Sequence, residues 1–166
     1  MSKIELIRVD FRMIHGQVIV KWLKKTGANK IIAINDAIAF DPFLADIYRM
    51  AAPSGVTIET MTRDDAIQYL TADHGGNEKL LILLKSVEDA YYCYKHGMPM
   101  VHLQIGGLGA GPNRINVFGA VTLDNADAKL LKEMQDGGVD VYFHLVPDES
   151  KADLDKILSK YNFDLT

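Results

Sequence analysis

The sequence lacks the features that mark secreted, metal-binding or membrane-spanning proteins. Its 166 residues include a single cysteine, Cys93, so no disulfide can form within the chain and a thiol-rich zinc site is disfavoured. The first ten residues are charged and contain no apolar signal core. No segment approaches the roughly 20 apolar residues that a helix needs to cross a bilayer. We therefore expect a cytoplasmic protein that does not insert into the membrane.

Basic charge and metal-ligand spacing are also missing. The formal net charge is −4 and the pI is about 5.7, which argues against a general nucleic-acid binder. The histidines outside the first loop have no partner at metal-ligand spacing, so no metal site is expected there; they are His74, His96, His102 and His144. There is no internal repeat and no linker-like segment, and the length suits a single domain over residues 1–166.

Short apolar segments alternate with longer amphipathic ones along the chain. The predicted strands are 4–9, 30–35, 56–61, 79–85, 100–105 and 139–146, with 115–123 also extended. The predicted helices are 15–25, 42–52, 63–72, 86–96, 124–136 and 149–161. This alternation predicts an α/β fold, a single doubly wound and mostly parallel sheet with helices on both faces. In such sheets ligands bind beyond the carboxyl ends of the strands.

The loop after the first strand concentrates chemistry-bearing residues. Arg8, Asp10, Arg12 and His15 lie within eight residues, and the histidine is predicted at a helix start. A neutral imidazole is a nucleophile near pH 7. Free amides at the helix start and Arg12 would stabilise a phosphoryl group added to it, with Arg8 adding to the positive field. Gly16 would let a partner approach closely.

Two questions about this loop stay open at the level of sequence. Asp10 either accepts a hydrogen bond from the imidazole or holds Arg12 in place, and the spacing does not distinguish these roles. A histidine near a helix start is also often a cap, and an Arg-Asp-Arg cluster is often a surface ion-pair set.

The segment RVDFRMIHGQVIVKWL, residues 8–23, resembles the signature of the IIB family of mannose/fructose/sorbose phosphotransferase systems (PTS), R-[IV]-D-[DE]-R-L-I-H-G-Q-V followed by Trp. Two positions depart from that pattern: Phe11 replaces an acidic residue and Met13 replaces Leu. Segments 31–56 and 138–149 also resemble the family, so the similarity covers nearly the whole chain. A loop in the middle of the chain also departs from the family pattern. The family has N-[VI]-G-x there, whereas this sequence has Gln104-Ile105-Gly106-Gly107.

The resemblance implies a specific activity, that of a protein-Nπ-phosphohistidine–sugar phosphotransferase. His15 would receive a phosphoryl group at Nδ1 from the IIA subunit, with Arg12 contacting the phosphate and no metal or organic cofactor taking part. It would pass the group to a sugar held by the membrane subunits IIC and IID, to which the chain would associate peripherally. Because those subunits would bind the sugar, this sequence does not identify it.

Other residues suggest weaker alternatives. The glycine-rich segment 106–114 favours a nucleotide-binding α/β domain, but it lacks both the G-x-G-x-x-G spacing and a Walker lysine. Otherwise we expect it to form a flexible wall of the His15 site or part of the face that docks a partner, with Arg114 either reaching the phosphate or exposed to solvent. Asn35 and Asp36 follow the second strand and either support the His15 loop or form an ordinary turn. A non-catalytic regulatory module of sugar transport is the remaining alternative.

Overall fold

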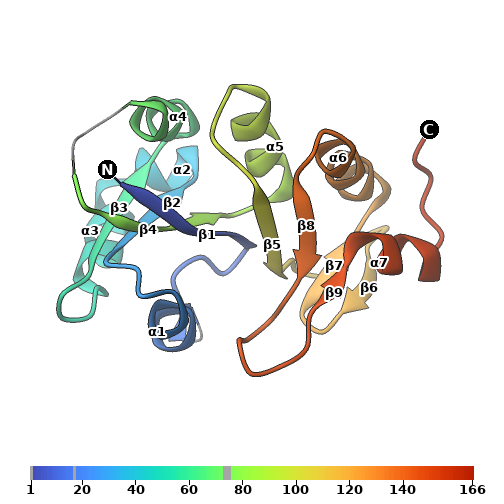
Figure 1. Cartoon of the computed structure of the whole chain (residues 1–166), viewed down its shortest axis with the longest axis horizontal. Helices are drawn as coiled ribbons and strands as arrows, with labels where there is room; N and C mark the ends of the chain where they lie inside the picture. Colours follow the sequence, from blue (N-terminus) through green and yellow to red (C-terminus); the bar gives the residue numbers. More distant parts are fainter. Residues whose placement is uncertain (1, 17, 73–75) are drawn as a thin grey trace.

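A computed structural model describes residues 2–16, 18–72 and 76–166, and its centre is a seven-stranded sheet (Figure 1). The strands lie in the order β3-β2-β4-β1-β5-β8-β9, and every neighbouring pair is parallel except β8 and β9. Their bounds are β1 (Lys3–Asp10), β2 (Lys30–Ile34), β3 (Thr57–Met61), β4 (Lys79–Leu84), β5 (His102–Gly107), β8 (Asp140–Phe143) and β9 (Ala152–Asp153). The predicted α/β class and mostly parallel sheet are confirmed.

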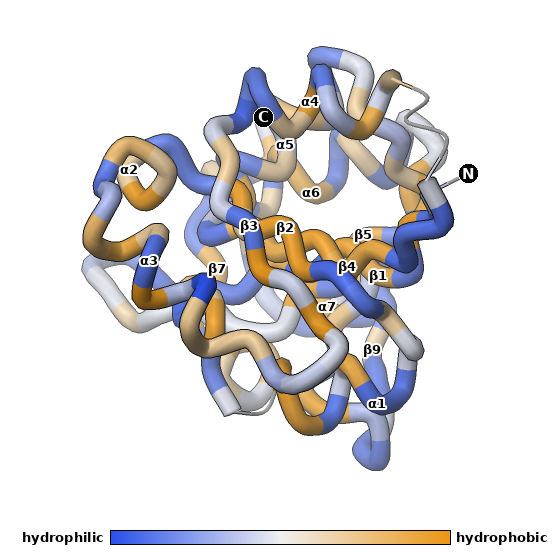
Figure 2. Tube along the Cα trace, turned by 90° about the vertical axis from the view of Figure 1, so that its left-hand side faces the viewer, coloured by the Kyte–Doolittle hydropathy of each residue, from blue (hydrophilic) through white to orange (hydrophobic). Residues whose placement is uncertain are grey.

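Helices cover both faces of this sheet, as predicted. They are the π-helix η1 (Val18–Trp22), α1 (Leu23–Thr26), α2 (Asp36–Ala39), α3 (Pro42–Met50), α4 (Arg63–Thr71), α5 (Val87–Lys95), α6 (Asn125–Asp136) and α7 (Leu154–Lys160). One core joins the sheet to η1, α1 and α3, and the other joins it to α4, α5, α6 and α7. In Figure 1, α1 lies on the opposite side of the sheet from α4 and α5. Figure 2 shows the apolar strands between these layers.

Local sequence explains where the larger helices begin. Asp41, Thr62, Ser86, Asp124 and Asp153 each accept a hydrogen bond from a backbone N–H in the first turn that follows. These side chains satisfy amides that would otherwise have no partner at a helix start. β4 is buried at every position after its first residue, which fits a central strand covered on both faces.

Several boundaries differ from the sequence prediction. Gly16 is helical, close to the predicted helix start at His15, but residues Val18–Trp22 form a π-helix. The short α2 precedes the predicted helix at Pro42. Segment 115–123 is an antiparallel hairpin of β6 (Ile115–Phe118) and β7 (Val121–Leu123), which turns at Gly119 with φ +50°. β8 ends at Phe143, and the short β9 precedes α7. Gln17, His74 and most of the predicted loop 73–77 lie outside the described residues.

Candidate functional site

The candidate site is built on the carboxyl end of β1, the strand between β4 and β5. There the chain turns sharply, and Met13 donates its N–H to the carbonyl of Asp10 over 2.9 Å. Met13 has a φ of +58°, a left-handed conformation that few non-glycine residues adopt, and its side chain is buried. Phe11 donates its N–H to Gly107 of β5 over 3.0 Å. This turn fixes the positions of Arg12 and His15 relative to the sheet.

The buried carboxylate of Asp10 joins the three other polar side chains of the loop. Its Oδ1 accepts hydrogen bonds from the N–H and Nε of Arg12, at 3.1 and 2.9 Å. Its Oδ2 lies 3.1 Å from Nη2 of Arg8, 3.0 Å from Nη2 of Arg12 and 2.9 Å from Nε2 of His15. Burial acts to raise the pKa of Asp10, but the bonds from His15 and Arg12 and the charge of Arg8 hold that pKa well below its usual range.

The contact with Asp10 decides which nitrogen of His15 can act as a nucleophile. An ionised carboxylate only accepts hydrogen bonds, so Nε2 of His15 carries the proton. In the neutral ring, Nδ1 then carries the free lone pair. Within the described residues, Nδ1 has no hydrogen-bond partner, and the side chain is 19% exposed. The arrangement suits attack on an electrophile brought by another molecule.

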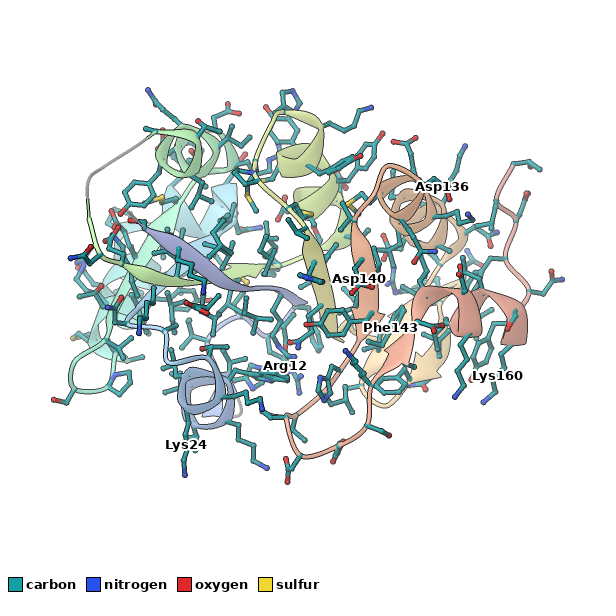
Figure 3. The ribbon with its side chains drawn as sticks, viewed as in Figure 1. Arg12, Lys24, Asp136, Asp140, Phe143 and Lys160 are labelled. Atoms are coloured by element: carbon teal, nitrogen blue, oxygen red, sulfur yellow. The ribbon has the colours of Figure 1, made fainter. Side chains whose placement is uncertain are left out.

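Arg12 offers a positive group beside this histidine. Its Nε and Nη2 form a two-pronged contact with Asp10, and Nη2 also lies 3.4 Å from the carbonyl of Gly106. Its Nη1 makes no hydrogen bond to the described part of the chain, and the side chain is 31% exposed. Figure 3 shows Arg12 near the middle of the molecule, between α1 and the end of β8. A bound anion would therefore meet an oriented guanidinium.

Arg8 has a different position from the one expected of a phosphate ligand. Its side chain is fully buried, with Nη1 bonded to Gln104 at 2.6 Å and to the carbonyl of His144 at 2.8 Å. Nη2 bonds Asp10 and the carbonyl of Leu145. Burial lowers the pKa of Arg8, while Asp10 raises it. Arg8 therefore supports the site from the interior by bonding Asp10. It offers no donor to a ligand at the surface.

Two adjacent glycines in β5 make room for these charges. A Cβ at Gly106 would lie 2.0 Å from Cζ of Arg8, and one at Gly107 would lie 2.7 Å from Oδ1 of Asp10. No larger residue fits at either position without moving the ion pair. The sequence pattern indicated a phosphate loop at these glycines as one alternative and did not reveal this role. Two consecutive glycines at the end of a buried strand were the signal that could have revealed it.

The remaining predicted site residues are Gly16, Asn35 and Asp36. At Gly16 a Cβ would meet nothing within 4 Å, so the backbone there is open to a partner. The side chain of Asn35 bonds Asp89 and the N–H of Ile38, and Asp36 accepts from the N–H of Arg63. Within the described part of the chain, neither bonds His15.

Arg114 is held by its own neighbourhood instead of reaching the site. It bonds Thr122, Asp124 and Asp127 at distances from 2.8 to 3.0 Å. It lines a surface cavity of about 730 Å³ together with Asn35, Asp36 and Phe11. The cavity thus borders the first loop at Phe11.

Residues 2–16, 18–72 and 76–166 contain neither a cluster of potential metal ligands nor a helix that could span a membrane. No group of three or more His, Cys, Asp or Glu side chains in these ranges is placed to hold a metal ion. No helix in the same ranges is long and apolar enough to cross a membrane.

Known proteins resemble the chain over nearly its whole length. The family model described as PTS system sorbose subfamily IIB component matches residues 4–166. The sorbose-specific EIIB component of Klebsiella pneumoniae is 30% identical over 93% of this chain and 95% of that relative. The mannose-specific EIIAB component of Escherichia coli (strain K12) is 26% identical over 95% of this chain, which spans 49% of that longer relative. The crystal structure of manxB from Thermoanaerobacter tengcongensis has a TM-score of 0.90 at 34% identity, covering 97% of this chain and 98% of that one.

Proposed function

Because the chain belongs to the sorbose subfamily of IIB components of the sugar phosphotransferase system, we propose that it carries a phosphoryl group on Nδ1 of His15. The observation that carries the proposal is the hydrogen bond of 2.9 Å between Nε2 of His15 and the buried Asp10. It occupies one ring nitrogen of a partly exposed side chain and leaves the other as the nucleophile. Arg12, Asp10 and His15 form the proposed catalytic group.

Loading proceeds by displacement between two histidines. The Nδ1 lone pair of His15 attacks the phosphorus of a phosphohistidine on the IIA subunit. The donor N–P bond breaks, and its electron pair returns to the donor imidazole. Nε2 keeps its proton, so the phosphorylated ring of His15 is positively charged and faces the carboxylate of Asp10. The free Nη1 of Arg12 neutralises part of the phosphoryl charge.

Unloading reverses these roles. A hydroxyl of the sugar held by membrane subunits IIC and IID attacks the phosphorus and loses its proton to a base in that complex. The N–P bond at His15 breaks, and its electrons return to Nδ1. Because Nε2 is already protonated, the ring leaves as neutral imidazole and keeps its hydrogen bond to Asp10. Asp10 keeps its charge throughout, since its pKa lies well below its usual range.

Both partners have to reach the same histidine, so they bind in turn. The open backbone at Gly16 and the exposed edges of Arg12 and His15 form the proposed face for this contact. We place the chain in the cytoplasm, against the membrane transporter and without insertion into the bilayer. The single-domain organisation over residues 1–166 is part of the same proposal.

Phosphate transfer from a phosphorylated IIA component tests the function directly. We expect the wild-type chain to take up acid-labile phosphate and the His15→Ala variant to take up none. His96→Ala is the matched control, because His96 is exposed and bonds only the carbonyl of Tyr92 in the described part of the chain. Equal uptake by wild type and His15→Ala would exclude His15 as the carrier.

The alternative functions make different predictions. A nucleotide-binding domain would need an open glycine loop, whereas Arg8 and Asp10 pack against Gly106 and Gly107. Tight binding of ATP or NAD, measured by calorimetry, would nevertheless favour that alternative. A purely regulatory module would leave sugar phosphorylation intact in a reconstituted system from which this chain is omitted. We expect that omission to abolish it.

A further inference from the structure

Phe11 is the large apolar side chain in the middle of the charged loop. It follows Asp10 directly in the turn, and the residue is 40% exposed. Its ring packs on the backbone of Gly109, where an added Cβ would lie 3.3 Å from the nearest ring carbon. The ring therefore stays at the surface while remaining fixed in position by the glycine-rich segment.

The ring is close to the guanidinium that would hold phosphate. Cζ of Arg12 lies 5.8 Å from the centroid of the Phe11 ring, within the range of a cation–π contact. Asp10 binds the same guanidinium through Nε and Nη2. Arg12 is thus held by a carboxylate and bordered by an aromatic face, while Nη1 makes no bond within the described residues.

The identity of residue 11 also sets the charge of the loop. Arg8 and Arg12 contribute two positive charges and Asp10 contributes one negative charge, which leaves the loop with an excess of one positive charge. A carboxylate at position 11, next to Asp10 in the chain, would cancel that excess. A phosphoryl group brings between about 1.5 and 2 negative charges at pH 7, so this excess favours the phosphorylated state.

We propose that Phe11 is a positioning residue that orients Arg12 toward the phosphoryl group and keeps the loop positively charged. The proposal rests on the proposed function at His15 and assigns to this loop a stronger hold on phosphate than an acidic residue at position 11 would allow. Phe11 acts through Arg12 and takes no part in bond making.

Phosphoramidate, a small-molecule phosphoryl donor, tests this without any partner protein. Its P–N bond breaks, the new bond forms at Nδ1 of His15, and ammonia leaves. Phe11→Glu adds the charge, Phe11→Gln removes the ring without adding charge, and Phe11→Tyr keeps the ring. Rate constants of phosphorylation are measured at low salt and at 1 M salt, and phosphorus NMR follows the ionisation of the bound phosphoryl group.

We expect Phe11→Glu to slow phosphorylation about three- to tenfold at low salt, because like charges repel. At 1 M salt the Debye length falls to about 3 Å, so most of that loss should disappear. Phe11→Gln should slow the reaction by about two- to threefold at both salt concentrations, since it loses the cation–π contact. Phe11→Tyr should restore the wild-type rate. Phe11→Glu should also raise the pKa of the phosphoryl group, because an added negative charge opposes formation of the dianion.

The outcomes separate this inference from the proposed function. If wild-type protein loads phosphate on His15 and the Glu and Gln variants match it in rate and in phosphoryl ionisation, the inference on Phe11 is overturned while the carrier function stands. If His15→Ala loads as fast as wild type, both are overturned. Should Phe11→Glu fail to fold, as judged by circular dichroism, the comparison of Gln with Tyr still decides the role of the ring.

Discussion

Asp10 contacts every other charged or titratable side chain of the first loop, and this answers the question that the sequence left open. The residue types and their spacing identified Asp10, Arg12 and His15 as a group. They did not distinguish a partner of the imidazole from a partner of the guanidinium, because both lie within reach along the chain. The structure gives Asp10 both roles. Arg8 could not be placed from sequence, because its burial depends on the distant loop at His144 and Leu145.

Replacing Asp10 with Asn should impair phosphorylation without removing the histidine. An amide at this position can donate to Nε2, which would place the ring proton on Nδ1 and block the nucleophile. We expect a loss on the order of a hundredfold or more in the rate of phosphate uptake, the size typical of a wrong tautomer. Asp148→Asn is the control, since Asp148 is exposed and makes only a long contact with Lys21 in the described structure. Uptake within twofold of wild type would contradict the assigned role.

Arg8→Met should weaken the fold strongly. It removes one of the two arginine partners of the buried Asp10 carboxylate and leaves Gln104 and two carbonyl groups without their donor. Breaking one side of a buried ion pair costs about 3–5 kcal/mol, which urea denaturation would measure. Arg49→Met offers a matched comparison, because its ion pair with Asp46 is exposed. A similar small loss in both variants would show that Arg8 is not needed for stability.

At the scale of elements, helix caps and buried apolar runs were readable from sequence, whereas short irregular elements were not. Thr62 directly precedes a predicted helix, Ser86 and Asp124 stand at the predicted starts of two others, and each caps a helix in the structure. The π-helix at Val18 and the two-residue strand β9 carry no comparable local pattern. The hairpin of β6 and β7 was read as one extended segment, because the turn at Gly119 lies inside a continuous apolar stretch.

Arg114 should stabilise this hairpin by joining it to the next helix. It bonds the side chain and the carbonyl of Thr122 in β7, as well as Asp124 and Asp127 at the start of α6. Arg114→Leu is therefore expected to cost about 2 kcal/mol in unfolding free energy and to speed hydrogen exchange in the hairpin. Lys132→Ala removes an exposed ion pair on the same helix and should leave exchange in the hairpin unchanged. If hydrogen exchange in the hairpin is unaltered in Arg114→Leu, Arg114 does not stabilise the hairpin.

At the scale of the whole molecule, the two cores meet at the sheet, and the larger one encloses Cys93. Burial raises the pKa of the Cys93 thiol to about 12. The reactive thiolate is therefore scarce as well as inaccessible in the folded protein. Its reactivity reports on opening of the layer formed by α4, α5 and α6.

Labelling of Cys93 should accordingly follow unfolding. In native buffer we expect a thiol reagent to react at least about a thousandfold more slowly than with the unfolded chain, because access requires disruption of a core. The rate should rise with urea concentration in parallel with loss of circular dichroism. Rapid labelling without urea would mean that this layer opens independently of the rest of the fold.

The position of β1 between β4 and β5 also has a kinetic consequence for the carrier. Strands at the edges of a sheet exchange their amide hydrogens through local fraying, while an interior strand opens only with much of the molecule. The edge strands here are β3 and β9, and two strands separate β1 from each of them. Successive encounters with a donor and an acceptor can therefore open the edge strands locally without changing the turn that follows β1. The imidazole keeps its position for the next cycle of transfer.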